Sequence, residues 1–205
     1  MINYLLNLEI NDYNMVVFAW NIFLALIPCV IAYFLQNNFR YQKWGVLDSW
    51  HKVEFLILFI IWFFFFPNTA YLMSDIRHLV NYCDHPGLYR MCKDQAYIVP
   101  IFFTYALIGL PTFYYALSKM ATTLKQLFNQ TSARLLPILM IPLTSLGLML
   151  GLVARYNSWD VILKPFKIIH TTFLFLADPV MLLNILSYTV MLYLIYYFIQ
   201  AVRSK

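Results

Sequence analysis

The sequence predicts an all-α, polytopic membrane protein in a single domain, residues 1–205, with about five transmembrane helices and one or two interfacial helices. Three observations lead to this fold class. Charged residues make up 11% of the chain, whereas a soluble domain carries about a quarter. Hydrophobic residues make up 62% and recur in runs long enough to cross a bilayer. Lys and Arg gather at the ends of these runs, where they meet lipid headgroups rather than a nucleic acid.

The first predicted span, residues 13–35, contains no charged residue. A short acidic lead precedes it, and the first Lys or Arg of the chain is Arg40, so we expect no cleavable signal peptide. The polar loop that follows carries Trp44 and Trp50, which are typical anchors at a membrane interface.

The second predicted span, residues 53–71, contains a break. Its apolar run ends at Phe66 and is followed directly by Pro67 and Asn68. At about 1.5 Å per residue, the run before Pro67 is too short for a hydrocarbon core of about 30 Å. We therefore expect the helix to continue past Pro67 to residue 71, before a polar connection that reaches residue 94.

The remaining spans are predicted at residues 96–117, 135–154 and 180–202, with a loop over residues 118–134. The fourth span carries Gly147 and Gly151 at the spacing that lets membrane helices approach closely. Residues 161–177 include an apolar run that is too short to cross as a helix, so we expect an interfacial or re-entrant segment there.

Counting Lys and Arg residues on the two sides of five spans gives eight on the side of the C-terminus and six on the other. The positive-inside rule then predicts a periplasmic N-terminus and a cytoplasmic C-terminus in a bacterial inner membrane. Parity also places the connections after the second and fourth spans on the same face. The two richest polar motifs of the chain occupy these two connections.

The first motif follows Pro67. Residues 69–82 have a helical pattern that places Tyr71, Asp75 and His78 on one face. Asp75 and His78 are therefore candidate catalytic residues, acting as an acid and base or as a pair of metal ligands. The alternative is that Asn68 caps this helix and the charged residues lie at headgroup level. Two ligands are too few for a metal site, so we predict none.

The second motif, RYNSWD, begins at Arg155. Asn157, followed three residues later by Asp160, resembles a helix N-cap with a capping acid. In the functional interpretation, Arg155 binds an anion or pairs with Asp75. Asn157 and Asp160 then line a site shared with Asn68.

Cys83 and Cys92 both lie in the third connection. If that connection is periplasmic, the two thiols are candidates for a disulfide, and if it is cytoplasmic they stay reduced. Their spacing matches no zinc-binding pattern that we know.

The two motifs together resemble a known family. The pattern F-x-PN-x-x-Y-L-x-x-D-x-x-H-L at residues 65–79 and R-x-NSWD at residues 155–160 are similar to a bacterial integral-membrane family, domain of unknown function 1361. The stretch W-N-x-F-L-A-L-x-P at residues 20–28 agrees with it. The resemblance implies a bacterial inner-membrane protein and implies no reaction.

Our leading functional hypothesis is a polar pocket at the outer interface that binds a lipid headgroup or a protein partner. Its predicted lining residues are Asn68, Tyr71, Asp75, His78, Arg155, Asn157 and Asp160. A membrane-embedded enzyme acting on a lipid or lipid-linked substrate is the first alternative. A small transporter is the second, although the spans offer it only neutral polar residues. The sequence contains no motif for a cofactor and no basic, aromatic surface for nucleic acid, so the cofactor stays unknown.

Overall fold

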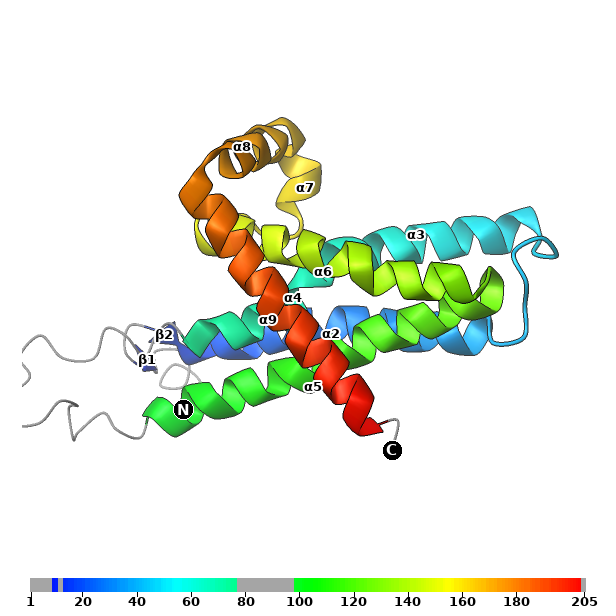
Figure 1. The fold of residues 1–205 in the computed structure, drawn as a ribbon, viewed down its shortest axis with the longest axis horizontal. Coiled ribbons are helices and arrows are strands. Elements are labelled where there is room, and N and C mark those ends of the chain that lie inside the picture. The colour runs from blue at the N-terminus through cyan, green and yellow to red at the C-terminus, as the bar shows by residue number, and fades with distance from the viewer. Residues whose placement is uncertain (1–8, 11–12, 77–97, 204–205) are drawn as a thin grey trace, which may run out of the picture.

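The computed structural model describes residues 9–10, 13–76 and 98–203. This part of the chain is an all-α bundle, as predicted (Figure 1). A two-residue antiparallel ladder between β1, Glu9–Ile10, and β2, Tyr13–Asn14, precedes the helices. Among the described residues, five helical segments are long and apolar enough to cross a membrane. These segments are Val16–Asn38, Ser49–Ser74, Val99–Leu127, Gln130–Leu152 and Pro179–Arg203.

The second membrane segment is divided at the predicted break. Helix α3, Ser49–Phe65, ends one residue before α4, Pro67–Ser74, because Pro67 has no amide hydrogen to continue the helical bonding. At its other end α3 is capped by Asp48, whose carboxylate accepts a hydrogen bond from the amide of His51. At about 1.5 Å per residue α3 alone is shorter than a hydrocarbon core, so the crossing needs α4 as well.

The first span is helix α2, Met15–Asn38, and it packs against α3, α4 and α5. Helix α5, Ile98–Leu127, is longer than the predicted third span. Helix α6, Gln130–Leu152, also begins earlier than expected, because Asn129 caps it by accepting a hydrogen bond from the amide of Ser132. The loop expected over residues 118–134 is therefore helical except for Phe128 and Asn129.

Short helix α4 lies at the centre of the bundle, in contact with α2, α5 and α6. Two glycines allow this. A Cβ atom added at Gly109 of α5 would lie 2.8 Å from the Cγ of Met73, and one added at Gly147 of α6 would lie 2.9 Å from the Cγ of Pro67. Glycine at these positions lets both neighbouring backbones approach α4 more closely than any other residue would.

The main core is rich in aromatic side chains. The rings of Phe59, Trp62, Phe66 and Phe113 stack in sequence, with centroids 5.6, 4.8 and 5.4 Å apart. Trp62, Phe66 and Phe113 are fully buried. This stack runs from α3 through Phe66 at the break to Phe113, so it holds the end of α3 and the break itself to α5.

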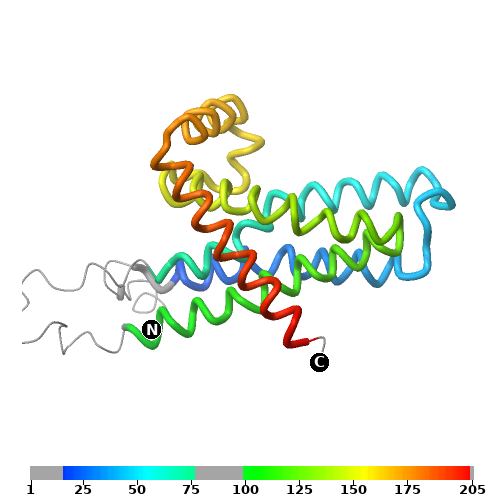
Figure 2. The backbone as a smooth tube through the Cα atoms, viewed as in Figure 1, coloured from blue at the N-terminus to red at the C-terminus, as the bar shows by residue number. Residues whose placement is uncertain are grey.

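The last third of the chain begins with a short turn of helix, α7, Asp160–Leu163, followed by α8, Pro165–Ala177. Helix α8 has 13 apolar-rich residues, none of them buried, and is too short to span a bilayer. Helix α9, Pro179–Arg203, returns obliquely across α6 to the other end of the bundle (Figure 2). The ends of α4 and α6 lie at one end of the bundle, while the α2–α3 loop and the α5–α6 turn lie at the other (Figure 1).

Candidate functional site

The two polar motifs meet at Asn68. Its side-chain amide donates one hydrogen bond to the carbonyl oxygen of Phe65, 3.0 Å away, and another to the hydroxyl of Ser158, 2.9 Å away. Asn68 does not cap α4, as the alternative interpretation had it, because Phe66 is the N-cap residue and forms no side-chain cap. The Asn68 side-chain amide instead bonds the carbonyl oxygen of Phe65 at the proline break and connects the break to Ser158 in the loop after α6.

The loop after α6 begins with an unusual backbone conformation. Arg155 has a φ of 59°, and among the described residues it is the only non-glycine with positive φ. The amide of Tyr156 donates to the carbonyl oxygen of Leu150, 3.1 Å away, which closes the end of the helix. A left-handed conformation costs a residue with a Cβ about 1–2 kcal/mol, so the surrounding bonds must hold Arg155 in place.

Asp160 provides two of the contacts that hold this loop. Its carboxylate accepts a hydrogen bond from the backbone amide of Asn157, 2.8 Å away. It also forms an ion pair with the ammonium group of Lys164, 3.0 Å away. The Asn157 amide and then Lys164 lower the pKa of Asp160 below its usual value. The predicted capping acid thus bonds the amide of Asn157, although α7 begins only at Asp160 itself, after Trp159.

A further contact fixes the loop to α8. The hydroxyl of Tyr156 lies 3.3 Å from the hydroxyl of Thr171, and one of the two donates a hydrogen bond to the other. Together with Asn68–Ser158, this contact holds the RYNSWD loop between α4 and α8. The loop is therefore positioned by side chains from both sides of the space that it borders.

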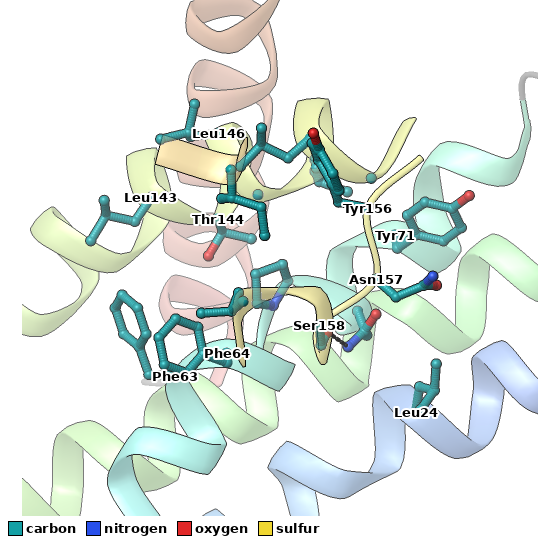
Figure 3. A pocket seen from close by; sticks show the side chains of 18 of the residues that line it. Leu24, Phe63, Phe64, Tyr71, Leu143, Thr144, Leu146, Tyr156, Asn157 and Ser158 are labelled. Carbon is teal, nitrogen blue, oxygen red and sulfur yellow. Dashed lines mark hydrogen bonds between the residues drawn. The ribbon is translucent and has the colours of Figure 1, made fainter. Parts of the chain in front are cut away.

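That space is a cavity of about 560 Å³ between α2, the α3–α4 break, α6 and α8. Figure 3 shows Phe63, Phe64 and Leu143 at one end of the view and Tyr71 and Asn157 at the other, with Ser158 between them. The volume falls within the range of about 300–1,000 Å³ that is common for ligand pockets. The polar lining residues are Asn21, Asn68, Tyr71, Thr144, Arg155, Tyr156, Asn157 and Ser158. The cavity thus has a mainly apolar end, where Thr144 beside Leu143 is a polar exception, and a polar end around Tyr71, Asn157 and Ser158 (Figure 3).

The structure brings together four of the predicted site residues. Asn68, Tyr71, Arg155 and Asn157 line the cavity. Asp75, which is fully buried just after α4, does not line it. Asp160 is only 4% exposed and is also absent from the lining, since its carboxylate faces Asn157 and Lys164. The other three candidates, His78, Cys83 and Cys92, lie outside the described residues.

Sequence reasoning missed Ser158, Asn21 and Tyr156. Ser158 lies inside the RYNSWD motif, but nothing in the sequence distinguishes its hydroxyl as a site residue from the other residues of that motif. Asn21 did give a signal, because an amide in the middle of an uncharged span is a functional candidate by default. Tyr156 resembles any other tyrosine at a membrane interface, and only its bond to Thr171 reveals its position.

Arg155 gives the cavity its charge. Within the described part of the chain, its guanidinium forms no ion pair, whereas Lys164 is paired with Asp160. No group of three or more His, Cys, Asp or Glu side chains that could hold a metal ion is found among the described residues. The polar lining of the cavity therefore offers a cation, the three side-chain amides of Asn21, Asn68 and Asn157, and hydroxyl groups.

Comparison with curated proteins and with solved structures gives no match. The family described as "Protein of unknown function (DUF1361)" matches residues 20–199, most of the chain. Both polar motifs and all five membrane segments lie wholly or largely within the matched region. The chain is therefore a multi-pass membrane protein that belongs to the family "Protein of unknown function (DUF1361)".

Proposed function

We propose that this protein binds an amphiphile with an anionic headgroup and an apolar tail, a lipid or a lipid-linked molecule, in the cavity between α2, α4, α6 and α8. One observation carries the proposal. Arg155, which has no carboxylate partner among the described residues, lines the cavity and directly precedes Tyr156 and Asn157 in the chain, and the end of the cavity at Phe63 and Phe64 is mainly aromatic and aliphatic. A ligand that matches both ends must combine an anion with hydrocarbon.

The polar end is suited to a headgroup. A cation beside a low-dielectric region is stabilised by a bound anion, and a guanidinium can bind phosphate or carboxylate oxygens through two parallel hydrogen bonds. The backbone at Arg155 is held by the bonds of the RYNSWD loop, so little ordering is needed when the ligand binds. The side-chain amide of Asn157 lies in the same lining, whereas the two N–H groups of Asn68 already donate to Phe65 and Ser158.

The apolar end is suited to a chain in the bilayer. Trp20 on α2, Leu143 on α6 and Ile169 on α8 line the cavity and are 49%, 44% and 53% exposed. In a membrane, these surfaces face lipid rather than water, so the cavity is accessible from within the bilayer. A tail lying against Phe63 and Phe64 would extend a headgroup contact at Arg155 into hydrocarbon.

The enzymatic alternative depends on Asp75 and His78. Asp75 lies outside the lining of the cavity, and His78 lies outside the described residues. Binding therefore has the stronger support. A protein partner would compete for the same exposed apolar surface, and the experiment below separates it from a lipid.

We also propose that the protein resides in a bacterial inner membrane with its N-terminus in the periplasm. The support is the count of Lys and Arg residues and the odd number of membrane segments, which puts the termini on opposite sides. A fluorescent protein fused after Lys205 is expected to fluoresce, and alkaline phosphatase fused there is expected to be inactive. The reverse pair of results would invert the orientation.

The binding test compares lipids that remain bound to the purified protein. We expect wild-type protein to retain an anionic amphiphile, detected by mass spectrometry after extraction. Arg155→Gln should lower its occupancy on the order of tenfold, because a charge-assisted hydrogen bond is lost. Arg134→Gln, in the first turns of α6 and so at the end of that helix away from the Arg155 loop, is the matched control and should have no effect.

Thermal unfolding of the three proteins shows whether each variant is folded. Equal lipid occupancy in wild type and in folded Arg155→Gln would contradict the proposal. A wild-type protein that retains another polypeptide and no amphiphile would contradict it as well.

A further inference from the structure

A second cavity, of about 360 Å³, lies toward the opposite end of the bundle, between α2, α5 and α9. Its lining residues are Gln36, Tyr114, Ser118, Lys119, Thr122, Gln200 and Arg203. Two of them are basic and none is acidic. We propose that this cavity is a binding site for a phosphate group, separate from the amphiphile cavity at Arg155.

The two cations are held by aromatic rings. The ammonium of Lys119 lies 5.4 Å from the ring centroid of Tyr115, and the guanidinium carbon of Arg203 lies 5.5 Å from that of Tyr114. Within the described residues neither cation forms an ion pair. A ring positions a cation without neutralising its charge, so both charges remain available to a ligand.

The neutral lining residues indicate which kind of ligand fits. Thr122 donates its hydroxyl hydrogen to the carbonyl oxygen of Ser118, 2.9 Å away, and Ser118 donates to that of Tyr115, 3.2 Å away. The donors left for a ligand are the two cations, the side-chain amides of Gln36 and Gln200, and the hydroxyl of Tyr114. A phosphate group, which presents several acceptor oxygens and negative charge, matches this set better than a cation or a neutral molecule does.

The surrounding charge favours an anion. The α2–α3 loop, the start of α3, the later part of α5, the start of α6 and the end of α9 lie toward this end of the bundle (Figure 1), and their described residues include seven basic and two acidic ones, against three basic and four acidic ones in the other described segments. The basic residues here are Arg40, Lys43, Lys52, Lys119, Lys125, Arg134 and Arg203, and the acidic ones are Asp48 and Glu54. This excess of positive charge attracts anionic groups at a membrane surface.

The phosphate could come from two sources, the headgroup of an anionic phospholipid in this leaflet or free phosphate in solution. Both present the same oxygens to Lys119 and Arg203. Phosphatidylglycerol, phosphatidylcholine and inorganic phosphate distinguish them. Phosphatidylcholine carries the phosphate together with a cation that the two basic side chains repel.

The test measures lipid binding to the purified full-length protein by native mass spectrometry. We expect wild type to bind phosphatidylglycerol more tightly than phosphatidylcholine. The double variant Lys119→Gln/Arg203→Gln should weaken phosphatidylglycerol binding on the order of tenfold or more. The matched control, Lys125→Gln/Arg134→Gln, removes the same charge from the same end of the bundle but from residues outside the lining, and it should bind like wild type.

Two further variants show whether a loss of binding comes from misfolding, and whether the bound lipid occupies the cavity at Arg155 instead. Lys119→Arg keeps the charge and should keep the binding, and Arg155→Gln should leave this site unchanged. Competition by inorganic phosphate would support the same site with a soluble source, and its absence together with phosphatidylglycerol binding would support the lipid source. Equal binding of the two lipids by wild type, or an equal loss in the control pair, would overturn the proposal.

Discussion

The side-chain amide of Asn68 donates a hydrogen bond to the hydroxyl of Ser158 at 2.9 Å, joining two positions that are 90 residues apart. This bond links the proline break in the second membrane segment to the loop that carries Arg155. It is the direct contact through which the two polar motifs of the chain become one site.

The bond predicts an energetic coupling between the two residues. Asn68→Ala and Ser158→Ala should each lower the thermal stability of the protein in detergent, and the double variant should lose less than the sum. The expected coupling is about 0.5–1 kcal/mol, the range for a hydrogen bond between membrane helices. Strictly additive losses would show that the two motifs are held together by other contacts.

Gly147 and Gly151 predict opposite responses to the same substitution. A Cβ atom at residue 147 would lie 2.9 Å from the Cγ of Pro67, whose ring cannot move aside, so Gly147→Ala should cost about 1–3 kcal/mol. At residue 151 the nearest atom, Cε2 of Tyr71, would be 3.5 Å away. Gly151→Ala should therefore be neutral, or stabilise the helix by up to about 1 kcal/mol. Thermal unfolding of the two variants, compared side by side, checks this difference in stability. Equal effects would show that α4 does not pack closely against the backbone at Gly147.

Because the backbone at Arg155 is left-handed, two substitutions there distinguish the contribution of this residue to folding from its contribution to binding. Arg155→Gly relieves the strain at this φ of 59°, so its stability should lie within about 1 kcal/mol of wild type. Arg155→Val places a β-branched residue there and should be less stable than both. Both variants lack the guanidinium and should lose the bound amphiphile. A glycine variant that is much less stable than the valine variant would refute the backbone argument.

The carboxylate of Asp160 predicts a dependence of stability on pH. Its pKa is lowered in the folded state, by the Asn157 amide first and Lys164 second. The charged carboxylate therefore stabilises the fold above the unfolded-state pKa of about 3.9, and this contribution is lost as the pH falls through the lower folded-state value. Wild type should lose more thermal stability than Asp160→Asn when the pH is lowered from 5 toward 3. Parallel curves for the two proteins would show that the carboxylate is not held as described.

Much of the fold could be predicted from the sequence, because bilayer thickness fixes the length of an apolar run that crosses it. The ends of the helices were harder to predict. Helix α5 continues to Leu127 because residues beyond the apolar run still find partners: Met120 is fully buried, and the amide of Trp44 donates to the carbonyl oxygen of Leu127 at 3.0 Å. Such contacts depend on the tertiary structure and leave little trace in hydropathy.

The candidate site was predictable in outline and not in detail. Parity of the spans placed the two motifs on one face, and the structure joins them. Helical spacing placed Asp75 with Tyr71, but α4 ends at Ser74 and Asp75 enters a tighter turn. Asp75 is fully buried at that turn and does not line the cavity with Asn68 and Tyr71. Ser158 could be assigned a role only from its distance to Asn68.

The central claim is that an anionic amphiphile occupies the cavity beside Arg155. The most direct measurement uses an anionic phospholipid with a photoreactive group in its acyl chain, added to the purified protein, irradiated and mapped by peptide mass spectrometry. We expect labelling of peptides that carry Trp20, Phe63 and Leu143, and its loss in Arg155→Gln but not in Arg134→Gln. Labelling spread evenly over the outer faces of the helices, unchanged in Arg155→Gln, would contradict the claim.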